Sequence, residues 1–186
     1  GVGVQAQHDE DVANFRALTQ RNSQLLVGAD AAALLALYDE HEPRATLLLQ
    51  KEEYAAAFGP DPGQYGFDPS TYLALRANPV KILAGDYDIF GDGTVVLKRM
   101  LGHTPGHQAL YVRLPKTGNI LLSGDLAHFT DNWVHKRVPS FNFDKEQSVK
   151  TMQEAEQFLK ANNAILWIQH DLEQNAGIKR SPAYYD

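Results

Sequence analysis

The sequence favours a mixed α/β (α+β) protein in which helices pack outside β-sheets. Short apolar runs bounded by Gly, Pro and Asp indicate several strands, and helical spacing of apolar residues occurs before and after them. Their order along the chain is helices, then mostly antiparallel strands, then one helix and a last strand. With 186 residues, 44% of them hydrophobic, the chain is long enough for one domain with a sizeable core.

The first 44 residues predict an atypical, largely helical segment, which precedes a domain over residues 45–186. Helical spacing covers residues 9–20 and 28–41, and Pro43 ends the second helix. The small residues Val4 and Ala6 match a signal-peptidase site only in part, because no charged and apolar regions precede them. The compartment therefore stays open between the cytoplasm and the periplasm or exterior.

Apolar runs within residues 45–186 predict a series of strands with helices between and after them. Asp144 is the expected N-cap of the longest helix, and residues 91–93 and 115–118 are expected to turn two hairpins. Residues 59–68 and 129–143 have no clear periodicity and are expected to be irregular. The predicted strands are residues 45–50, 80–83, 87–90, 94–98, 109–114, 119–123 and 165–168, and the predicted helices are 51–58, 69–77 and 145–162.

Composition limits the kinds of partner. The net charge of −6, without a long basic run, argues against binding to nucleic acid or to an anionic membrane surface. No apolar run approaches the roughly 20 residues of a membrane-spanning helix. Because the chain has no cysteine, it has no disulfide and no thiolate ligand, and any bound metal would be held by histidine and carboxylate side chains.

Three polar residues follow the ends of predicted strands. His103 comes after residues 94–99, Asp125 after 120–124, and His170 after 165–169. If these strands are neighbours in one sheet, the three side chains meet at one edge, and a carboxylate held between two imidazoles implies a cation. Taken singly, each has a simpler interpretation, as a hydrogen-bonded histidine or a turn aspartate. The coincidence of all three favours a metal site.

Three motifs carry a resemblance to a known family. Gly-His-Thr-Pro-Gly-His-Gln at 102–108, Leu-Leu-Ser-Gly-Asp at 121–125 and Trp-Ile-Gln-His-Asp at 167–171 resemble the metallo-β-lactamase superfamily. Within it, they are most similar to the N-acyl-homoserine-lactonase branch, and the likeness covers about residues 45–186. It implies an αββα sandwich with a binuclear metal site at the edge of two sheets, the N-terminal half of that fold being incomplete here.

The resemblance also implies roles for individual residues. His103 and His170 correspond to ligands of different metals, and Asp125 to the carboxylate that bridges them. His107 corresponds to a position outside the ligand set, from which it orients the loop or a ligand. His128 stands where some lactonases carry a tyrosine near the substrate carbonyl, and would act with Asp125 in catalysis as a donor to the oxyanion or leaving group.

The implied activity is that of a lactonase, a hydrolase in which two divalent metals, expected to be zinc, activate a water that opens a lactone ring. The same chemistry extends to esters, β-lactams or organophosphates, because substrate choice depends on the loops. Aromatic residues of the irregular segments are candidates for an apolar groove that holds an acyl chain, although loop aromatics more often pin a loop to the core. They are Tyr65, Phe67, Phe129, Trp133, Phe141 and Phe143.

One part of the family pattern is absent. The His-x-His-x-Asp-His segment of the superfamily does not occur, and residues 37–44 stand in its place. Two interpretations remain: a segment is missing from the sequence, or the chain is a homologue with a reduced metal site. His8, Asp9, Asp39 and His41 are the candidate substitutes, although solvated helix ends explain all four. With only two protein ligands for each metal, the chain is predicted to bind metal weakly and to turn over slowly.

An incomplete sandwich would leave an apolar sheet face in contact with solvent. That face would require a missing segment, a partner or a second copy of the chain to cover it. The alternative function is therefore a non-catalytic or metal-deficient relative that serves as a binding or assembly module and forms homo-oligomers.

Overall fold

The computed structural model describes residues 45–186. The predicted helices over 9–20 and 28–41, and the candidate substitutes His8, Asp9, Asp39 and His41, lie outside the described residues. Residues 45–178 and Asp186 belong to one compact unit, and this unit contains all the elements named below. No helix in the described part combines the length and the apolar character needed to cross a bilayer.

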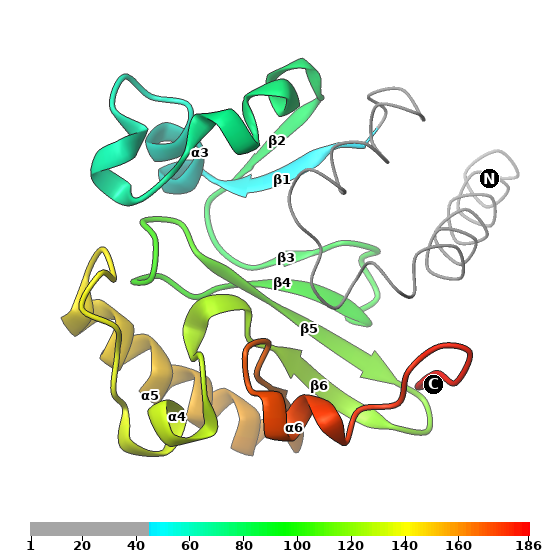
Figure 1. Ribbon diagram of the computed structural model, residues 1–186. Coiled ribbons are helices and arrows are strands. Elements are labelled where there is room, and N and C mark those ends of the chain that lie inside the picture. Colours follow the sequence, from blue (N-terminus) through cyan, green and yellow to red (C-terminus); the bar gives the residue numbers. More distant parts are fainter. Residues whose placement is uncertain (1–44) are drawn as a thin grey trace, which may run out of the picture. The chain divides into compact units, whose positions relative to one another are not determined.

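Most strands form a single five-stranded sheet (Figure 1). Its order is β3 (Tyr87–Asp88), β4 (Val95–Arg99), β5 (Gln108–Leu114), β6 (Gly118–Leu122) and β7 (Ala164–Trp167). The first four strands pair antiparallel, whereas β7 pairs parallel with β6. The two expected hairpins, β3–β4 and β5–β6, are therefore confirmed.

Strand direction brings three chain ends to one edge of this sheet. Both β4 and β6 are antiparallel to β5, so they run in the same direction, and β7 runs with them. The carboxyl ends of β4, β6 and β7 therefore lie at the same edge. The segments that leave this edge are the ones that carry His103, Asp125 and His170.

A second, smaller sheet pairs β1 (Leu47–Gln50) parallel with β2 (Val80–Leu83). A buried glutamine joins it to the larger sheet. The Gln50 side chain is fully buried, and its amide donates to the Gly85 carbonyl at 2.9 Å and to Gln108 Oε1 at 3.2 Å. Gln108 in turn donates to the Leu48 carbonyl at 2.8 Å, so the two sheets are tied by a partly buried network of hydrogen bonds.

The longest helix, α5 (Lys145–Ala161), covers one face of the five-stranded sheet (Figure 1). Asp144 caps it by accepting a hydrogen bond from the Gln147 N–H at 2.8 Å, as the sequence predicts. Met152 and Ala155 have no solvent exposure and pack in the same cluster as Leu121 of β6. This cluster is the main core, and the remaining buried members include Met100, Ala109, Tyr111, Leu126, Ala127, Leu159, Leu166 and Ile168.

Several short helices differ from the sequence predictions. Residues 69–77 were expected to form one α-helix, but they form two 3₁₀ helices, η2 (Pro69–Thr71) and η3 (Leu73–Ala77). Neither contains a buried residue, so no apolar face sustains a longer helix. The expected helix after β1 is present as α3 (Lys51–Ala57), and the loop after it holds η1 (Pro62–Tyr65).

Two further helices fall in segments that showed no helical periodicity. They are α4 (Thr130–His135) and α6 (Leu172–Ala176), both without a buried residue. A helix of one or two turns with no buried face leaves no apolar pattern in the sequence. The first residue of α4, Thr130, donates its N–H to the distant Asp171, and the same aspartate caps α6 by accepting from the Gln174 N–H.

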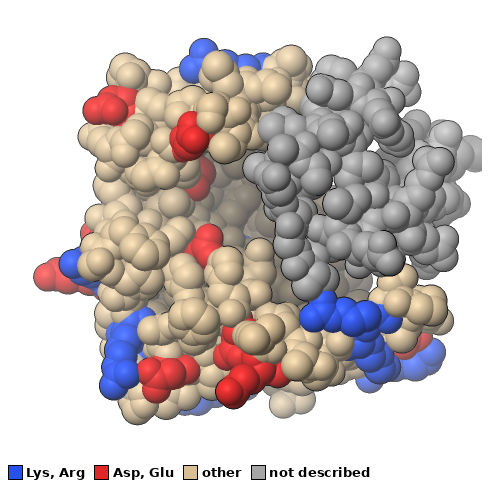
Figure 2. Space-filling view, in the orientation of Figure 1, with Lys and Arg blue, Asp and Glu red and all other residues tan. Residues whose placement is uncertain are grey.

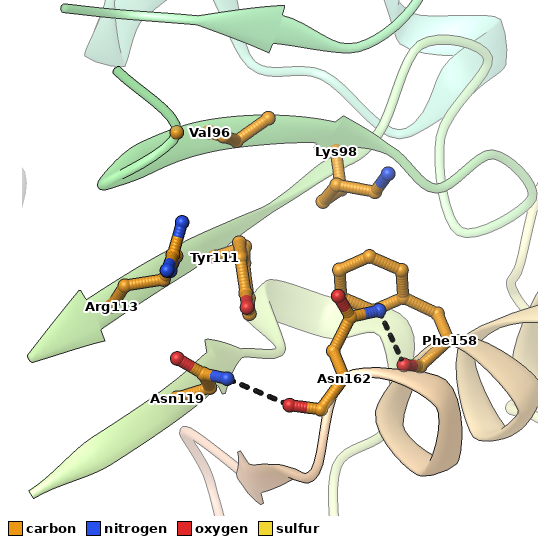
Figure 3. Close-up of a pocket in the computed structure, with 8 residues that line it drawn as sticks. Val96, Lys98, Tyr111, Arg113, Asn119, Phe158 and Asn162 are labelled. Carbon is orange, nitrogen blue, oxygen red and sulfur yellow. Dashed lines mark hydrogen bonds between the residues drawn. The ribbon is translucent and has the colours of Figure 1, made fainter.

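A cavity of about 420 Å³ opens beside α5, against β4, β5 and β6 (Figure 3). Lys98 lies over the Phe158 ring at 4.4 Å, and Asn119 donates to the Asn162 carbonyl at 2.7 Å. No histidine lines this cavity, so it is distinct from the edge where the polar residues gather. Over the described surface seen in Figure 2, acidic and basic side chains are interspersed.

The loop between β4 and β5, residues 100–107, is held between α5 and α3 by two glycines. A Cβ on Gly102 would lie 2.4–2.6 Å from Ser148 atoms, and the Gly102 φ is +126°. A Cβ on Gly106 would lie 2.4 Å from the Glu53 nitrogen. Only glycine permits both close backbone contacts. The segment that carries His103 is therefore packed tightly between α5 and α3.

We predict that Gly102→Ala lowers the free energy of unfolding by about 2–4 kcal/mol, because it adds backbone strain and a clash with a helix backbone. Chemical denaturation would measure this. Gly63→Ala is the control, since its Cβ would meet nothing closer than 3.8 Å, and it should change stability by less than about 0.5 kcal/mol. Equal effects of the two substitutions would contradict the tight packing of this loop.

Candidate metal centre

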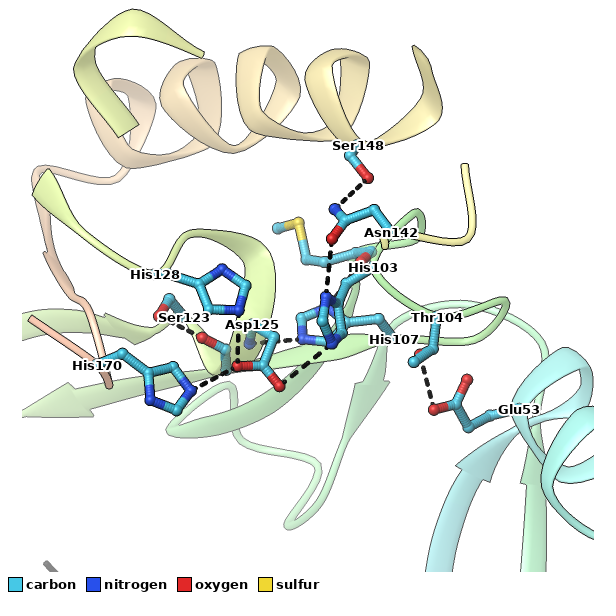
Figure 4. Close-up of polar contacts among 12 residues, drawn as sticks. Glu53, His103, Thr104, His107, Ser123, Asp125, His128, Asn142, Ser148 and His170 are labelled. Carbon is cyan, nitrogen blue, oxygen red and sulfur yellow. Dashed lines mark hydrogen bonds and ion pairs between the residues drawn. The ribbon is translucent and has the colours of Figure 1, made fainter. Parts of the chain in front are cut away.

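The Asp125 carboxylate is the centre of the polar cluster at the sheet edge (Figure 4). His170 Nε2 lies 2.8 Å from Asp125 Oδ1, and His128 Nε2 lies 3.8 Å from the same oxygen. His103 Nε2 lies 3.5 Å from the other oxygen, Oδ2. The structure thus brings together the three residues expected from strand ends, and adds His128 to them.

A tight turn after β6 presents Asp125. Gly124 has a φ of +53°, and a Cβ there would lie 2.8 Å from His107 Nε2, so the turn requires glycine. The Ser123 hydroxyl is fully buried and accepts a 3.4 Å hydrogen bond from the Gln169 N–H, which ties the turn to the segment that carries His170. The parallel pairing of β6 with β7, which ends at Leu122 and Trp167, therefore fixes the separation between Asp125 and His170.

His107 holds the backbone of Asp125 by a hydrogen bond. It is buried, its Nδ1 lies 2.8 Å from the Met100 carbonyl, and its Nε2 accepts the Asp125 N–H at 2.9 Å. A carbonyl accepts only, so Nδ1 carries the proton and Nε2 the lone pair. Burial lowers the pKa of His107, which keeps this neutral tautomer. His107 thus stays outside the group around the carboxylate and positions the Asp125 backbone.

A chain of hydrogen bonds sets the tautomer of His103. Asn142 donates to the Ser148 hydroxyl at 2.9 Å, and that hydroxyl donates to the Asp144 carbonyl at 2.6 Å. The Asn142 oxygen therefore faces His103 Nδ1, at 3.1 Å, and Nδ1 must donate to it. This leaves the Nε2 lone pair of a neutral His103 directed at a carboxylate oxygen, an arrangement that needs a proton or a cation between the two atoms.

Charge around Asp125 favours its anionic form. Burial raises the pKa of Asp125, but the neighbouring imidazoles of His103 and His170 outweigh it and lower that pKa below the usual range. Burial lowers the pKa of His128 below the usual histidine value, although Asp125 opposes the shift. A carboxylate anion and neutral imidazoles are the forms in which these groups bind metal.

The donor set fits a divalent cation. The ligand atoms of Asp125, His128 and His170 all lie within 4.8 Å of one another, whereas His103 falls outside this compact group. Imidazole nitrogen and carboxylate oxygen are the donors that zinc takes in catalytic sites, where three protein ligands are common. These residues would hold such an ion, and the predicted ligand set of His103, Asp125 and His170 remains a prediction.

Glu53 of α3 anchors the loop that carries His103. Its carboxylate accepts hydrogen bonds from the Thr104 hydroxyl and from the Gly106 N–H, each at 2.7 Å. Burial raises the pKa of Glu53, while these two hydrogen bonds oppose the shift. Sequence patterns do not reveal this contact, because an acidic residue in the first turn of a helix is usually explained by the helix dipole.

The candidate aromatic groove is divided by the structure. Trp133 of α4 packs against the core, and Phe67 packs edge-on against Tyr72 with ring centres 6.2 Å apart, so these two aromatics pack against other side chains. Phe141 is 72% exposed, and its ring centre lies 6.1 Å from those of both His103 and His128. Phe129 and Phe143 are also more than half exposed. An exposed aromatic surface therefore adjoins the histidines.

Comparison with known proteins relates the sequence to one group of enzymes. The chain is 35% identical over 148 residues to the N-acyl homoserine lactonase AttM of Azorhizobium caulinodans. The aligned region covers 77% of this chain and 56% of AttM. It is 30% identical over 138 residues to an N-acyl homoserine lactonase of a Bacillus species, covering 74% of this chain and 52% of the relative. This chain is a homologue of the N-acyl homoserine lactonases, a branch of the metallo-β-lactamase superfamily.

Solved structures of such lactonases share the fold of the described residues. An N-acyl homoserine lactone hydrolase with N-hexanoyl-L-homoserine at its catalytic metal centre superposes with a TM-score of 0.68 at 25% identity, over 87% of this chain and 58% of that chain. An AiiA variant of Bacillus thuringiensis with N-decanoyl-L-homoserine bound also has a TM-score of 0.68, at 26% identity over 84% of this chain and 56% of the other. No protein-family model matches.

The homologue spans little more than half the length of the relatives it matches. The expected metallo-β-lactamase-like architecture is confirmed for the described residues. The lactonase activity named for the relatives belongs to proteins of greater length than this chain.

We predict that Glu53→Ala lowers the free energy of unfolding by about 2–3 kcal/mol, because it leaves a half-buried hydroxyl and N–H without an acceptor. Glu52→Ala, on the same helix, is the matched control. Glu52 pairs with Arg99 near the surface at 2.7 Å, so its loss should cost at most about 1 kcal/mol. Urea denaturation of both variants would measure the difference, and a smaller effect at Glu53 than at Glu52 would refute the anchor.

A second prediction concerns acid stability. Asp171 accepts hydrogen bonds from the N–H groups of Gln174 and Thr130, and these contacts lower its pKa. A lowered carboxyl pKa stabilises the fold above the unfolded value of about 4, and this stabilisation is lost as pH falls through the folded pKa. Asp171→Asn should therefore be less stable than wild type at pH 7 and converge with it at low pH. A difference that stays constant between about pH 2 and 7 would rule this out.

Proposed function

We propose that this chain acts as a metal-dependent hydrolase of lactones, with N-acyl homoserine lactones as the substrate class. The observation that carries the proposal is the convergence of three imidazoles, from His103, His128 and His170, on the Asp125 carboxylate. Support comes from the lactonase names of its relatives and from the homoserine products bound in the matching structures.

The proposed cofactor is a divalent metal, zinc being the first choice for a site of nitrogen and oxygen ligands. Two such metals are expected from the sequence, and His103 would hold one and His170 the other, with Asp125 contributing to both. The chemistry that such an ion supplies when bound is polarisation of the lactone carbonyl and a lowered pKa for the attacking water. A dizinc lactonase is among the structures that share this fold.

The chain's own residues would orient the reaction. Asp125 supplies a fixed negative charge, and the N–H of its backbone is held by His107 at 2.9 Å. Asn142 accepts a hydrogen bond from His103 Nδ1–H, which favours the tautomer whose Nε2 lone pair faces Asp125. In the sequence-based hypothesis, His128 then donates a proton to the departing ring oxygen.

The acyl chain of the substrate would lie on the exposed aromatic surface. Phe141 lies against both His103 and His128, and Phe143 is in contact with Tyr65 at a ring-centre distance of 5.5 Å. An apolar chain placed there covers side chains that are otherwise in water, which favours binding by about 25 cal/mol per Å² of apolar area.

The alternative is a binding or assembly module that retains the fold without catalysis. It is favoured by one observation, the absence of the His-x-His-x-Asp-His segment from a chain that spans about half of its relatives. Such a module would bind lactone or a protein partner without dependence on metal.

The proposal is tested by measuring hydrolysis of N-hexanoyl homoserine lactone, with and without added zinc. The protons that the reaction releases are the readout. We expect activity that EDTA abolishes and zinc restores. Asp125→Asn should reduce the rate at least about 100-fold, because it removes the central anion. Asp131→Asn is the control, since Asp131 forms exposed ion pairs with His135 and Arg137 and should leave the rate unchanged.

Two results would contradict the proposal that the chain is a hydrolase. Activity retained by Asp125→Asn would show that the carboxylate is not at the reacting centre. Metal-independent binding of the lactone without turnover would identify the module instead.

A further inference from the structure

The rings of His128 and His170 lie face to face beside one oxygen. Their centres are 5.2 Å apart with an angle of 14° between the planes. Both Nε2 atoms are directed at Asp125 Oδ1, at 3.8 Å for His128 and 2.8 Å for His170 (Figure 4). Two imidazoles that share a carboxylate oxygen in this way surround a common point.

The distance at His128 fits a shared cation better than a hydrogen bond. An N–H···O hydrogen bond requires about 2.7–3.2 Å between the heavy atoms, so 3.8 Å is too long. Ligand atoms that surround a tetrahedral zinc at about 2.0–2.1 Å are separated by about 3.3 Å. The 2.8 and 3.8 Å separations lie on either side of that value, which small side-chain rotations would reach.

The other ring nitrogen of His128 has no competing role. Nδ1 is buried and has no hydrogen-bond partner, and the Phe141 ring packs perpendicular to the imidazole with ring centres 6.1 Å apart. The ring therefore faces the Asp125 carboxylate through Nε2 alone. A buried polar nitrogen without a partner is costly, and it indicates that the ring is placed for the contact made by Nε2.

The two histidines are also held together by their neighbours. Asp171, which follows His170, accepts hydrogen bonds from both the N–H and the hydroxyl of Thr130, two residues after His128. Ala127, on the other side of His128, is buried in the core. This pairing fixes the distance between two short segments that are far apart in the sequence, and ligands need such rigid support.

We propose that His128 is a metal ligand, and that Asp125, His128 and His170 form a His/Asp/His site for one divalent cation. The proposal rests on the hydrolase proposal only in that the cation is the same one. It replaces the proton-donor role, because a nitrogen whose lone pair binds a cation has no proton to give. His103, which faces Oδ2, lies outside this set.

A site of this composition answers the shortage of ligands that the sequence implied. Three protein ligands suffice for a catalytic zinc, with a position left for water or substrate. Here all three come from residues 125–170, so the proposal applies to this chain as it stands. The affinity should be moderate, because Nδ1 of His128 lacks the acceptor that normally supports a ligating histidine.

Cobalt(II) reports such ligands directly. Metal-free wild-type chain would be titrated with Co²⁺ and followed by visible absorption, with calorimetry for Zn²⁺. We expect His128→Phe to weaken Co²⁺ binding at least about 10-fold and to change the visible bands. His128→Cys should bind Co²⁺ with a new thiolate-to-cobalt band in the near ultraviolet, because thiolate, like imidazole, is a ligand in tetrahedral sites.

His135→Phe is the control for loss of a histidine. His135 forms a 3.4 Å pair with Asp131 but is half exposed, and no second imidazole lies beside it in the described part of the chain, so this variant should bind like wild type. Circular dichroism would establish that each variant is folded. If His128→Phe does not fold, the cobalt–thiolate band of His128→Cys decides the question.

Co²⁺ affinity unchanged in His128→Phe, or a His128→Cys chain that binds Co²⁺ without a thiolate band, would overturn the ligand assignment whatever the activity. Absence of Co²⁺ binding by wild type would overturn it as well. If the cobalt-loaded wild type binds as expected but does not hydrolyse N-hexanoyl homoserine lactone, the hydrolase proposal fails while the ligand assignment stands.

Discussion

The hydrogen bond from the Asp125 N–H to buried His107 is the interaction on which the site depends. It joins the turn after β6 to the loop before β5, and thereby fixes Asp125 against the segment that also carries His103. The bond exists only because the Met100 carbonyl selects one tautomer of His107 and because Gly124 leaves room for the ring. The histidines around the carboxylate can be arranged because this backbone is held first.

The same logic extends to the neighbouring groups. Asn142 orients His103, Glu53 holds the loop beside it, and Asp171 joins the segments of His128 and His170. None of these three touches the Asp125 carboxylate. Each fixes the position of a backbone segment or the tautomer of a histidine. This support allows a few side chains to direct their lone pairs at one point, although grouping polar atoms in this way is electrostatically unfavourable.

Much of the edge could be predicted from the sequence. Alternation and turn residues located β5, β6 and their hairpin, and the Asp144 cap located α5, because each signal is local. The convergence of the strand ends followed once β4, β6 and β7 were taken as neighbours. What pattern reading could not provide is the long-range support: Glu53 and Asn142 act on residues about 40–50 positions away. Short helices without a buried face, such as α4 and α6, leave no periodic signal either.

The two glycines of the histidine loop have a consequence for how this protein tolerates change. Gly102 and Gly106 bring the loop backbone into contact with α5 and α3, so any side chain added there meets a helix backbone. The segments around η1 and η2 bury no side chain in their helical turns. Sequence libraries for altered function should therefore diversify exposed positions of those segments, such as Asp61 and Gln64, and leave residues 102–108 unchanged, because the two regions differ in their tolerance to substitution.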